Sequence, residues 1–201
     1  NMKNVYLVGS DYVFPRTANK IIKAQLAASG GQTLAEEYTP LGHTDYATII
    51  SKIKAANPDV VYNTLNGDSN VAFFKQLQGA GITADKLTTL SVSIAEEEAV
   101  AIGGDIMAGH LVAWNYYETT KTPENEKFVK DYHAFTAKSG KQRPTSDPVE
   151  AAYISVNIWA EAVKKAGATD VEKVKAAIGG ITFAAPEGKI TVNGTNHHIS
   201  K

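Results

Sequence analysis

The sequence predicts an α/β fold with a doubly wound, mainly parallel, Rossmann-like sheet, followed by a helical C-terminal segment. Short apolar runs alternate with helix-length amphipathic segments in the first part of the chain. The runs recur about every 25 residues, an interval typical of consecutive βαβ units. After Trp114 the alternation stops, and two long helices and a hairpin follow. We therefore expect a complete α/β lobe at residues 1–115 and part of a second, incomplete lobe at residues 116–201.

Five apolar runs are the predicted strands of the sheet. β-branched residues are frequent in them and turn residues bound them, which favours strands over buried helices of the same length. The runs are residues 5–8, 33–38, 60–65, 87–92 and 109–114.

The helices between these strands are predicted from their terminal residues. Pro15 is expected near the start of the first helix, because proline is tolerated in a first turn. Thr44 is the predicted N-cap of the second helix, and Asp68 or Ser69 that of the third, because short polar side chains accept hydrogen bonds from free N–H groups. Gly or Asn-Pro follows each amphipathic stretch and ends it.

The C-terminal segment carries two long helical patterns. Thr122 precedes a proline and begins one, whose apolar stripe extends to Phe135; Asp147 begins the other, whose inner side includes Trp159. Asp170 is the predicted cap of a short helix. The remaining predicted elements are hairpin strands at 181–183 and 189–192. If the rest of the second lobe is absent, we expect the apolar helical faces to form an exposed patch.

Composition excludes several classes of protein. Lys and Arg number 20 against 21 Asp and Glu, for a net charge of −1, so no basic surplus is available for nucleic acid. The chain has no Cys, which removes disulfides and thiolate chemistry. No apolar run approaches the roughly 18 residues of a membrane span, and the first residues show no secretory signal pattern.

Motifs for catalysis or cofactor binding are missing. The loop after the first run holds Gly9 but no Gly-x-Gly-x-x-Gly, and there is no phosphate loop, so we expect no cofactor. His197 and His198 are adjacent, a spacing that favours an exposed loop over a metal site. The run Glu96-Glu97-Glu98 is interpreted as a helix first turn, where the dipole favours carboxylates. No serine has a nucleophile elbow around it, so an enzyme is not indicated.

Polar loops at the carboxyl ends of the strands are the candidate ligand site. Open α/β sheets bind ligands there. The loops at 9–14, 63–70 and 91–93 supply hydroxyls, amides and aromatic rings, with Asp11 and Asp68 as their charged residues. This chemistry suits a small, neutral, polar ligand held by hydrogen bonds against an aromatic ring. The alternative is that the Asn, Asp and Ser residues only form turns and helix caps.

The same loops carry a resemblance to a known family. Residues 9–19, GSDYVFPRTAN, look like the start of the second lobe in urea and short-chain amide binding proteins, which are type I periplasmic receptors of ABC transporters. Further similar strings follow in order over essentially the whole chain. They are EYTPLG at 37–42, NTLNGDSN at 63–70, AEEE at 95–98, TPEN at 122–125, TSDPVEAAY at 145–153 and FAAPEG at 183–188.

The resemblance implies a site between two lobes that close on the solute. Tyr12 matches an aromatic that covers the ligand, and Ser93 matches a hydroxyl position. Asn66 lies in a loop whose residue type varies among relatives, and Phe14 stands where the amide sensor has Tyr. Asp11 is expected to order the first loop. Family members begin with a first lobe that supplies the other half of the pocket, and that segment is not in this sequence.

The resemblance further implies a non-enzymatic, periplasmic or extracytoplasmic solute-binding protein. It would deliver urea or a small amide to an ABC permease in the membrane. One alternative is a cytoplasmic amide-sensing regulator of the same fold. Another is an α/β hydrolase acting on small amides. The sequence alone leaves these alternatives open, and urea shares its shape and most hydrogen-bonding groups with formamide and acetamide.

Overall fold

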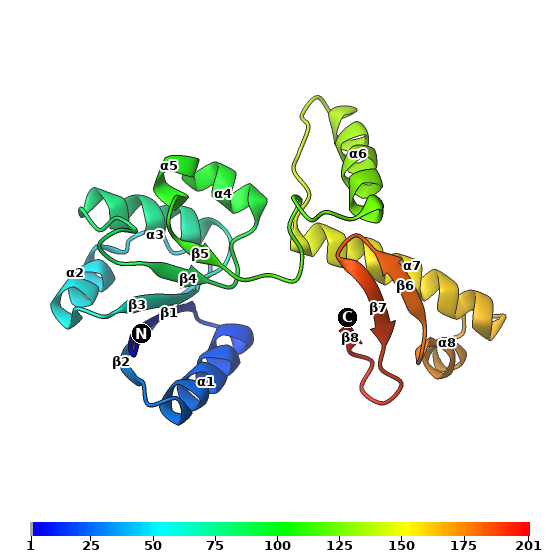
Figure 1. Cartoon of the computed structure of the whole chain (residues 1–201), viewed down its shortest axis with the longest axis horizontal. Helices are drawn as coiled ribbons and strands as arrows, with labels where there is room; N and C mark the ends of the chain where they lie inside the picture. The colour runs from blue at the N-terminus through cyan, green and yellow to red at the C-terminus, as the bar shows by residue number, and fades with distance from the viewer. Residues whose placement is uncertain (1) are drawn as a thin grey trace. The chain divides into compact units, whose positions relative to one another are not determined.

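Two units make up the part of the chain that this computed structural model describes, residues 2–201 (Figure 1). The first unit ends at Trp114, and the second is Asn115–Lys201. Each unit has its own buried apolar cluster.

The first unit is built on a five-stranded parallel sheet. Its strand order is β2-β1-β3-β4-β5, and every neighbouring pair is parallel. The strands are β1 (Asn4–Ser10), β2 (Gln32–Thr39), β3 (Val60–Thr64), β4 (Thr89–Ser91) and β5 (Leu111–Val112). The predicted α/β fold with a parallel sheet is confirmed, and the last two strands are shorter than the apolar runs that indicate them.

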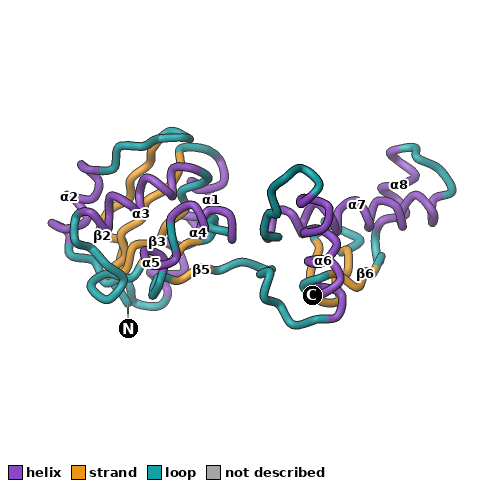
Figure 2. Tube along the Cα trace, turned by 90° about the horizontal axis from the view of Figure 1, so that it is seen from above, coloured by secondary structure: helices purple, strands orange, loops and turns teal. Residues whose placement is uncertain are grey.

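Helices lie along both faces of this sheet (Figure 2). Tyr6 and Val8 on β1 pack with α2, α3 and α4 in the main core, whereas Val5 and Leu7 pack with α1 in a smaller cluster. Side chains alternate between the faces of a strand, so one apolar run supplies both clusters. The helices are α1 (Val13–Ala28), α2 (Ala47–Ala56), α3 (Asp68–Gly79), α4 (Glu96–Ile102) and the short α5 (Gly104–Met107).

The predicted caps of α2 and α3 are wrong, whereas Pro15 lies in the first turn of α1 as expected. Helix α1 begins two residues before Pro15. Thr44 does not cap α2, which begins after Tyr46 and has no side-chain cap. Asp68 is already the first residue of α3, and the buried Ser69 hydroxyl has no hydrogen-bond partner, so neither caps that helix. The geometry of the preceding loop determines where each helix begins, and residue propensities predict such boundaries poorly.

The second unit combines three helices with a small antiparallel sheet of order β6-β7-β8. Asp170 caps α8 through its side-chain oxygen, as predicted, and Thr122, predicted to begin its helix, is the N-cap residue of α6. The elements are α6 (Pro123–Ala137), α7 (Asp147–Ala166), α8 (Val171–Ile178), β6 (Thr182–Ala185), β7 (Gly188–Val192) and β8 (Ile199–Ser200). The strand β8 was not predicted. None of the helices described in either unit has the length and apolar character needed to cross a membrane.

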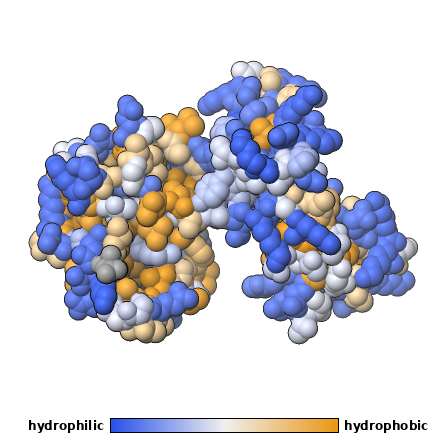
Figure 3. Space-filling model, in the orientation of Figure 1, coloured by the Kyte–Doolittle hydropathy of each residue, from blue (hydrophilic) through white to orange (hydrophobic). Residues whose placement is uncertain are grey.

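Helix α7 buries only one of its apolar faces. Ile154 and Ile158 pack against the hairpin formed by β6 and β7. Trp159 was predicted on the inner side but is 50% exposed, and Phe135 on α6 is 68% exposed. Within this unit the hairpin covers a single side of α7, so its second apolar stripe remains at the surface. On the side drawn in Figure 3, apolar residues gather over the first unit and hydrophilic ones cover much of the second.

Candidate functional site

The strand order places a change of chain direction at the carboxyl ends of β1 and β3. The chain leaves β1 through α1 on one face of the sheet, and leaves β3 through α3 on the other face. Loops that diverge in this way form a topological switch point, where doubly wound sheets bind ligands. The five residues predicted at the site all follow strands at this edge.

The loop after β1 presents an aromatic pair. Tyr12 is the half-buried N-cap residue of α1, in an extended conformation, and Phe14 in the first turn is 41% exposed. Their ring centroids are 6.3 Å apart, with the planes tilted by 45°. The backbone N–H of Tyr12 donates to the Ser10 carbonyl at 3.0 Å. This geometry offers an apolar surface for a planar ligand at the switch point.

Asp11 lies in this loop and its side chain forms an exposed ion pair. Its backbone N–H donates to the Thr39 carbonyl at 2.7 Å, and its carboxylate pairs with the Arg16 Nε at 2.6 Å. The hydrogen bond from Arg16 lowers the pKa of the Asp11 carboxyl below its usual range. The Arg16 guanidinium also lies 4.3 Å from the ring centroid of Tyr38. Arg16 is the basic residue nearest to the aromatic pair in the sequence, and its charge is therefore already paired with a carboxylate.

The loop after β3 is tied to the end of β1. The backbone N–H of Asn66 donates to the Ser10 hydroxyl at 3.1 Å, and its side-chain Nδ2 donates to the Thr64 carbonyl at 3.1 Å. The next residue, Gly67, has a φ of 59° and a ψ of −140°, a backbone conformation that L side chains rarely adopt. Within residues 2–201, both of these contacts use N–H groups of Asn66, so its Oδ1 remains an acceptor.

Ser93 follows β4 by two residues and is only 8% exposed. Its carbonyl accepts a hydrogen bond from the Asn70 side chain at 3.4 Å. Ser93 therefore lies at the predicted edge with most of its surface covered. A ligand would reach it over a small area.

Sequence reasoning missed the buried amides behind these loops. Asn63 on β3 and Asn70 on α3 are 1% and 0% exposed, and they are joined from Nδ2 of the first to Oδ1 of the second at 2.8 Å. An asparagine inside the apolar run VVYNTL, where the pattern calls for an inward apolar side chain, was the available signal.

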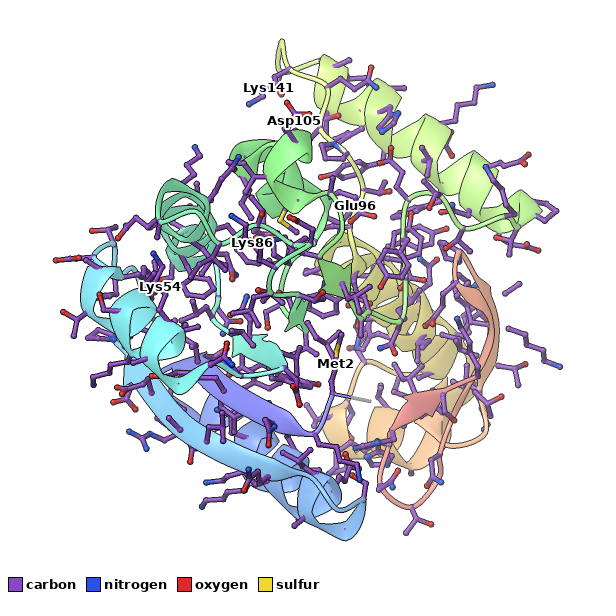
Figure 4. The ribbon with its side chains drawn as sticks, turned by 60° about the vertical axis from the view of Figure 1, so that its left-hand side comes forward. Met2, Lys54, Lys86, Glu96, Asp105 and Lys141 are labelled. Carbon is purple, nitrogen blue, oxygen red and sulfur yellow. The ribbon has the colours of Figure 1, made fainter. Side chains whose placement is uncertain are left out.

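The opposite edge of the sheet also has a hollow, of about 540 Å³. Phe74, Asp105 and His110 are among its lining residues, and Asp105 lies on α5 (Figure 4). Burial lowers the pKa of His110, whose Nδ1 accepts the backbone N–H of Thr89 at 3.0 Å. This imidazole thus holds the start of β4. Over residues 2–201, no three His, Asp or Glu side chains gather as a metal ion would require.

The acidic run after β4 is structural, as predicted. Glu96, Glu97 and Glu98 form the first turn of α4, and Glu96 is labelled in Figure 4. The Glu98 carboxylate accepts the backbone N–H of Ala95 at 3.0 Å. Carboxylates at a helix N-terminus are stabilised by the helix dipole, so this run needs no catalytic explanation.

Comparisons with known proteins agree with the fold. The Leu/Ile/Val-binding protein homolog 6 of Brucella melitensis is 24% identical over 203 residues, an alignment that covers 100% of this chain and 51% of that protein. The leucine-, isoleucine-, valine-, threonine- and alanine-binding protein of Pseudomonas aeruginosa is 29% identical over 170 residues, covering 84% of this chain and 43% of that protein. The chain therefore spans about half the length of the curated relatives it matches.

Solved structures extend this similarity to the backbone. A solute-binding protein of an ABC transporter from R. palustris, in complex with 4-hydroxybenzoate, superposes with a TM-score of 0.88 at 26% identity, covering 100% of this chain and 55% of that one. The model of the periplasmic binding protein domain matches residues 1–201. Since that model spans the whole chain, and the parallel sheet with its switch point is the arrangement such a receptor lobe requires, this chain belongs to the periplasmic binding protein family.

Proposed function

We propose that this chain is the ligand-binding part of an ABC-transporter receptor for a small, neutral, polar solute, with urea or a short amide as the leading candidate. It acts by binding, not by catalysis, outside the cytoplasm, and hands its solute to a membrane permease. Residues up to Trp114 supply one wall of the site. The second unit belongs to the partner lobe, whose remaining part supplies the other wall.

We infer a neutral ligand from the charged residues of three loops at the carboxyl ends of the strands. The loops at 10–14, 65–70 and 92–95 contain no Lys or Arg. Arg16, which follows the first loop, is paired with Asp11 at 2.6 Å. A ligand carboxylate would meet aromatic rings, amide groups and two aspartates here. A neutral amide finds a hydrogen-bond acceptor in Asn66 and a planar surface in Tyr12.

Aromatic and amino acids are the competing ligand class. The similar R. palustris protein holds 4-hydroxybenzoate, and the curated relatives are named for branched-chain amino acids. The aromatic pair of Tyr12 and Phe14 could also stack on a benzoate ring. In that case the cation that matches its carboxylate comes from the opposite wall.

Ligand size sets the affinity to expect. Urea has four non-hydrogen atoms, so a ceiling of about 1.5 kcal/mol per atom gives about 6 kcal/mol, or a Kd of tens of micromolar. Reaching that value requires almost every donor and acceptor to be paired in a closed, dry cleft. One wall leaves half of the ligand in water. We expect this chain alone to bind urea at millimolar strength or weaker.

Calorimetry with the product of the complete reading frame tests the proposal. Urea, acetamide, leucine and 4-hydroxybenzoate are titrated in parallel, and urea or acetamide is expected to bind at least about tenfold more tightly than either acid. Tyr12→Ala should weaken that binding at least about tenfold, whereas Tyr12→Phe, which keeps the ring, should retain most of it. Preferential binding of an acid overturns the neutral-ligand proposal, and unchanged affinity in Tyr12→Ala removes that ring from the site.

A further inference from the structure

The loops after β3 and β4 are held together by one side chain. The Asn70 Nδ2 donates to the Leu65 carbonyl at 2.9 Å and to the Ser93 carbonyl at 3.4 Å. Leu65 opens the loop that carries Asn66, and Ser93 lies in the loop after β4. Leu65 and Ser93 lie beyond the paired residues of their strands, so the ladder of the sheet does not fix these two carbonyls.

A second amide fixes the first. The Asn63 Nδ2 donates to the Asn70 Oδ1 at 2.8 Å and to the Ser91 hydroxyl at 3.0 Å. The Asn63 Oδ1 accepts the backbone N–H of Leu65 at 2.9 Å. Each of the two amides thus uses both its nitrogen and its oxygen, and both side chains are almost fully buried. A buried amide with all its partners has one orientation, because any rotation exchanges donors with acceptors.

We propose that Asn70, oriented by Asn63, is a positioning residue for the ligand. It sets the distance between Asn66 and Ser93 although it does not itself reach the solute. This inference rests on the proposed function, because it assigns those two residues to the site. A small polar ligand is sensitive to such positioning, since a displacement of about 1 Å breaks hydrogen bonds that a larger ligand could replace by packing.

A matched buried asparagine separates positioning from general stability. Asn19 on α1 is also fully buried, and its Nδ2 donates to the Tyr38 hydroxyl at 3.1 Å while its Oδ1 accepts from the Thr64 hydroxyl at 3.3 Å. It contacts neither the Leu65 nor the Ser93 carbonyl. Loss of Asn19 should therefore lower stability without moving the two loops.

The experiment measures affinity and loop protection in the product of the complete reading frame. Asn70→Asp keeps the size but places an acceptor against two carbonyls, and Asn70→Ser keeps one short donor. For whichever solute of the panel the parent binds, we expect Kd to rise about tenfold or more in Asn70→Asp, less in Asn70→Ser, and less than about twofold in Asn19→Ala. Hydrogen exchange measured by mass spectrometry should become faster at 65–67 and 92–95 in the Asn70 variants only.

The outcomes separate the two proposals. If the parent binds no solute of the panel, the proposed function fails, whatever the variants do. If the parent binds and both Asn70 variants keep their affinity within about twofold with unchanged exchange at the two loops, the positioning role is refuted. If Asn70→Asp does not fold, the milder Asn70→Ser decides, and equal weakening in Asn19→Ala would also count against the proposal.

Discussion

Substitution Glu150→Gln should stabilise the second unit at neutral pH and leave it unchanged in acid. Glu150 lies in the first turn of α7 and is 2% exposed. Its Oε1 accepts one long hydrogen bond, from the backbone N–H of Glu187 at 3.3 Å. Burial, aided by the nearby carboxylates of Glu187 and Asp147, raises the pKa of Glu150 from 4.5 to about 7. The folded chain therefore resists ionising this carboxyl more than the unfolded chain does.

The sign and size of the effect follow from that difference in pKa. Below about pH 4.5 the Glu150 carboxyl is protonated in both the folded and the unfolded state, so its ionisation does not change the free energy of unfolding. Between 4.5 and about 7 the unfolded state loses its proton first, and stability falls as the pH rises. Above that window the loss levels off at about 3 kcal/mol. Glutamine has the same shape and no charge, so it should recover about that amount.

Guanidinium chloride denaturation from about pH 4 to about pH 8.5 measures this difference. Guanidinium is used in place of urea because urea is the proposed ligand. Trp159 fluorescence reports the second unit in a Trp114→Phe background. The control is Glu161→Gln, an exposed carboxylate on the same helix that pairs with Lys164 at 2.6 Å, which should show no such pH-dependent gain. A Glu150→Gln variant that matches its parent at every pH, or gains stability only in acid, would refute the reasoning.

Two other substitutions address the first unit. Asp11→Asn removes the carboxylate that pairs with the Arg16 guanidinium. In the complete protein, the affinity for 4-hydroxybenzoate relative to urea should therefore rise up to about fivefold, and added salt should reverse the change. An unchanged ratio of affinities in calorimetry would show that the Asp11–Arg16 pair does not influence which ligand binds. Phe73→Ala removes a fully buried ring that packs edge-on against Tyr46 at 5.3 Å. It should lower the free energy of unfolding by about 3–5 kcal/mol in denaturant titrations, whereas the exposed Phe135→Ala should stay within about 0.5 kcal/mol.

Strand and layer structure could be predicted because burial on both faces makes parallel strands continuous in apolar residues. The run at 5–8 is a clear instance, since Val5 and Leu7 face α1 while Tyr6 and Val8 face the opposite helices. Helix caps were harder to predict than strands. Thr122 and Asp170 precede regular helices and do cap them, whereas Thr44 lies in a longer turn where Tyr46 becomes the last residue before the helix.

The candidate site was predicted at the level of its edge but not of its internal order. Tyr12, Asn66 and Ser93 follow strands, and strand order alone brings them to one side of the sheet. The position of each of these residues depends on hydrogen bonds to residues far away in the sequence. The Ser10 hydroxyl, for example, accepts a hydrogen bond from the backbone N–H of Asn66, which lies 56 positions further along the chain. Periodicity carries no information on which distant polar atoms meet, so the tie between these loops emerges only in three dimensions.

Asn63 and Glu150 share a feature that explains why the hydrophobic pattern did not predict their burial and why their burial affects the surrounding structure. Each is a polar side chain almost fully buried, a placement that costs free energy unless partners are provided. Asn63 has a partner for each of its polar atoms and so fixes a loop beside the candidate site. Glu150 has one long hydrogen bond and neighbouring carboxylates, and so makes its unit sensitive to pH. The number of partners, which the sequence does not encode locally, decides whether a buried polar residue orders its surroundings or loosens them.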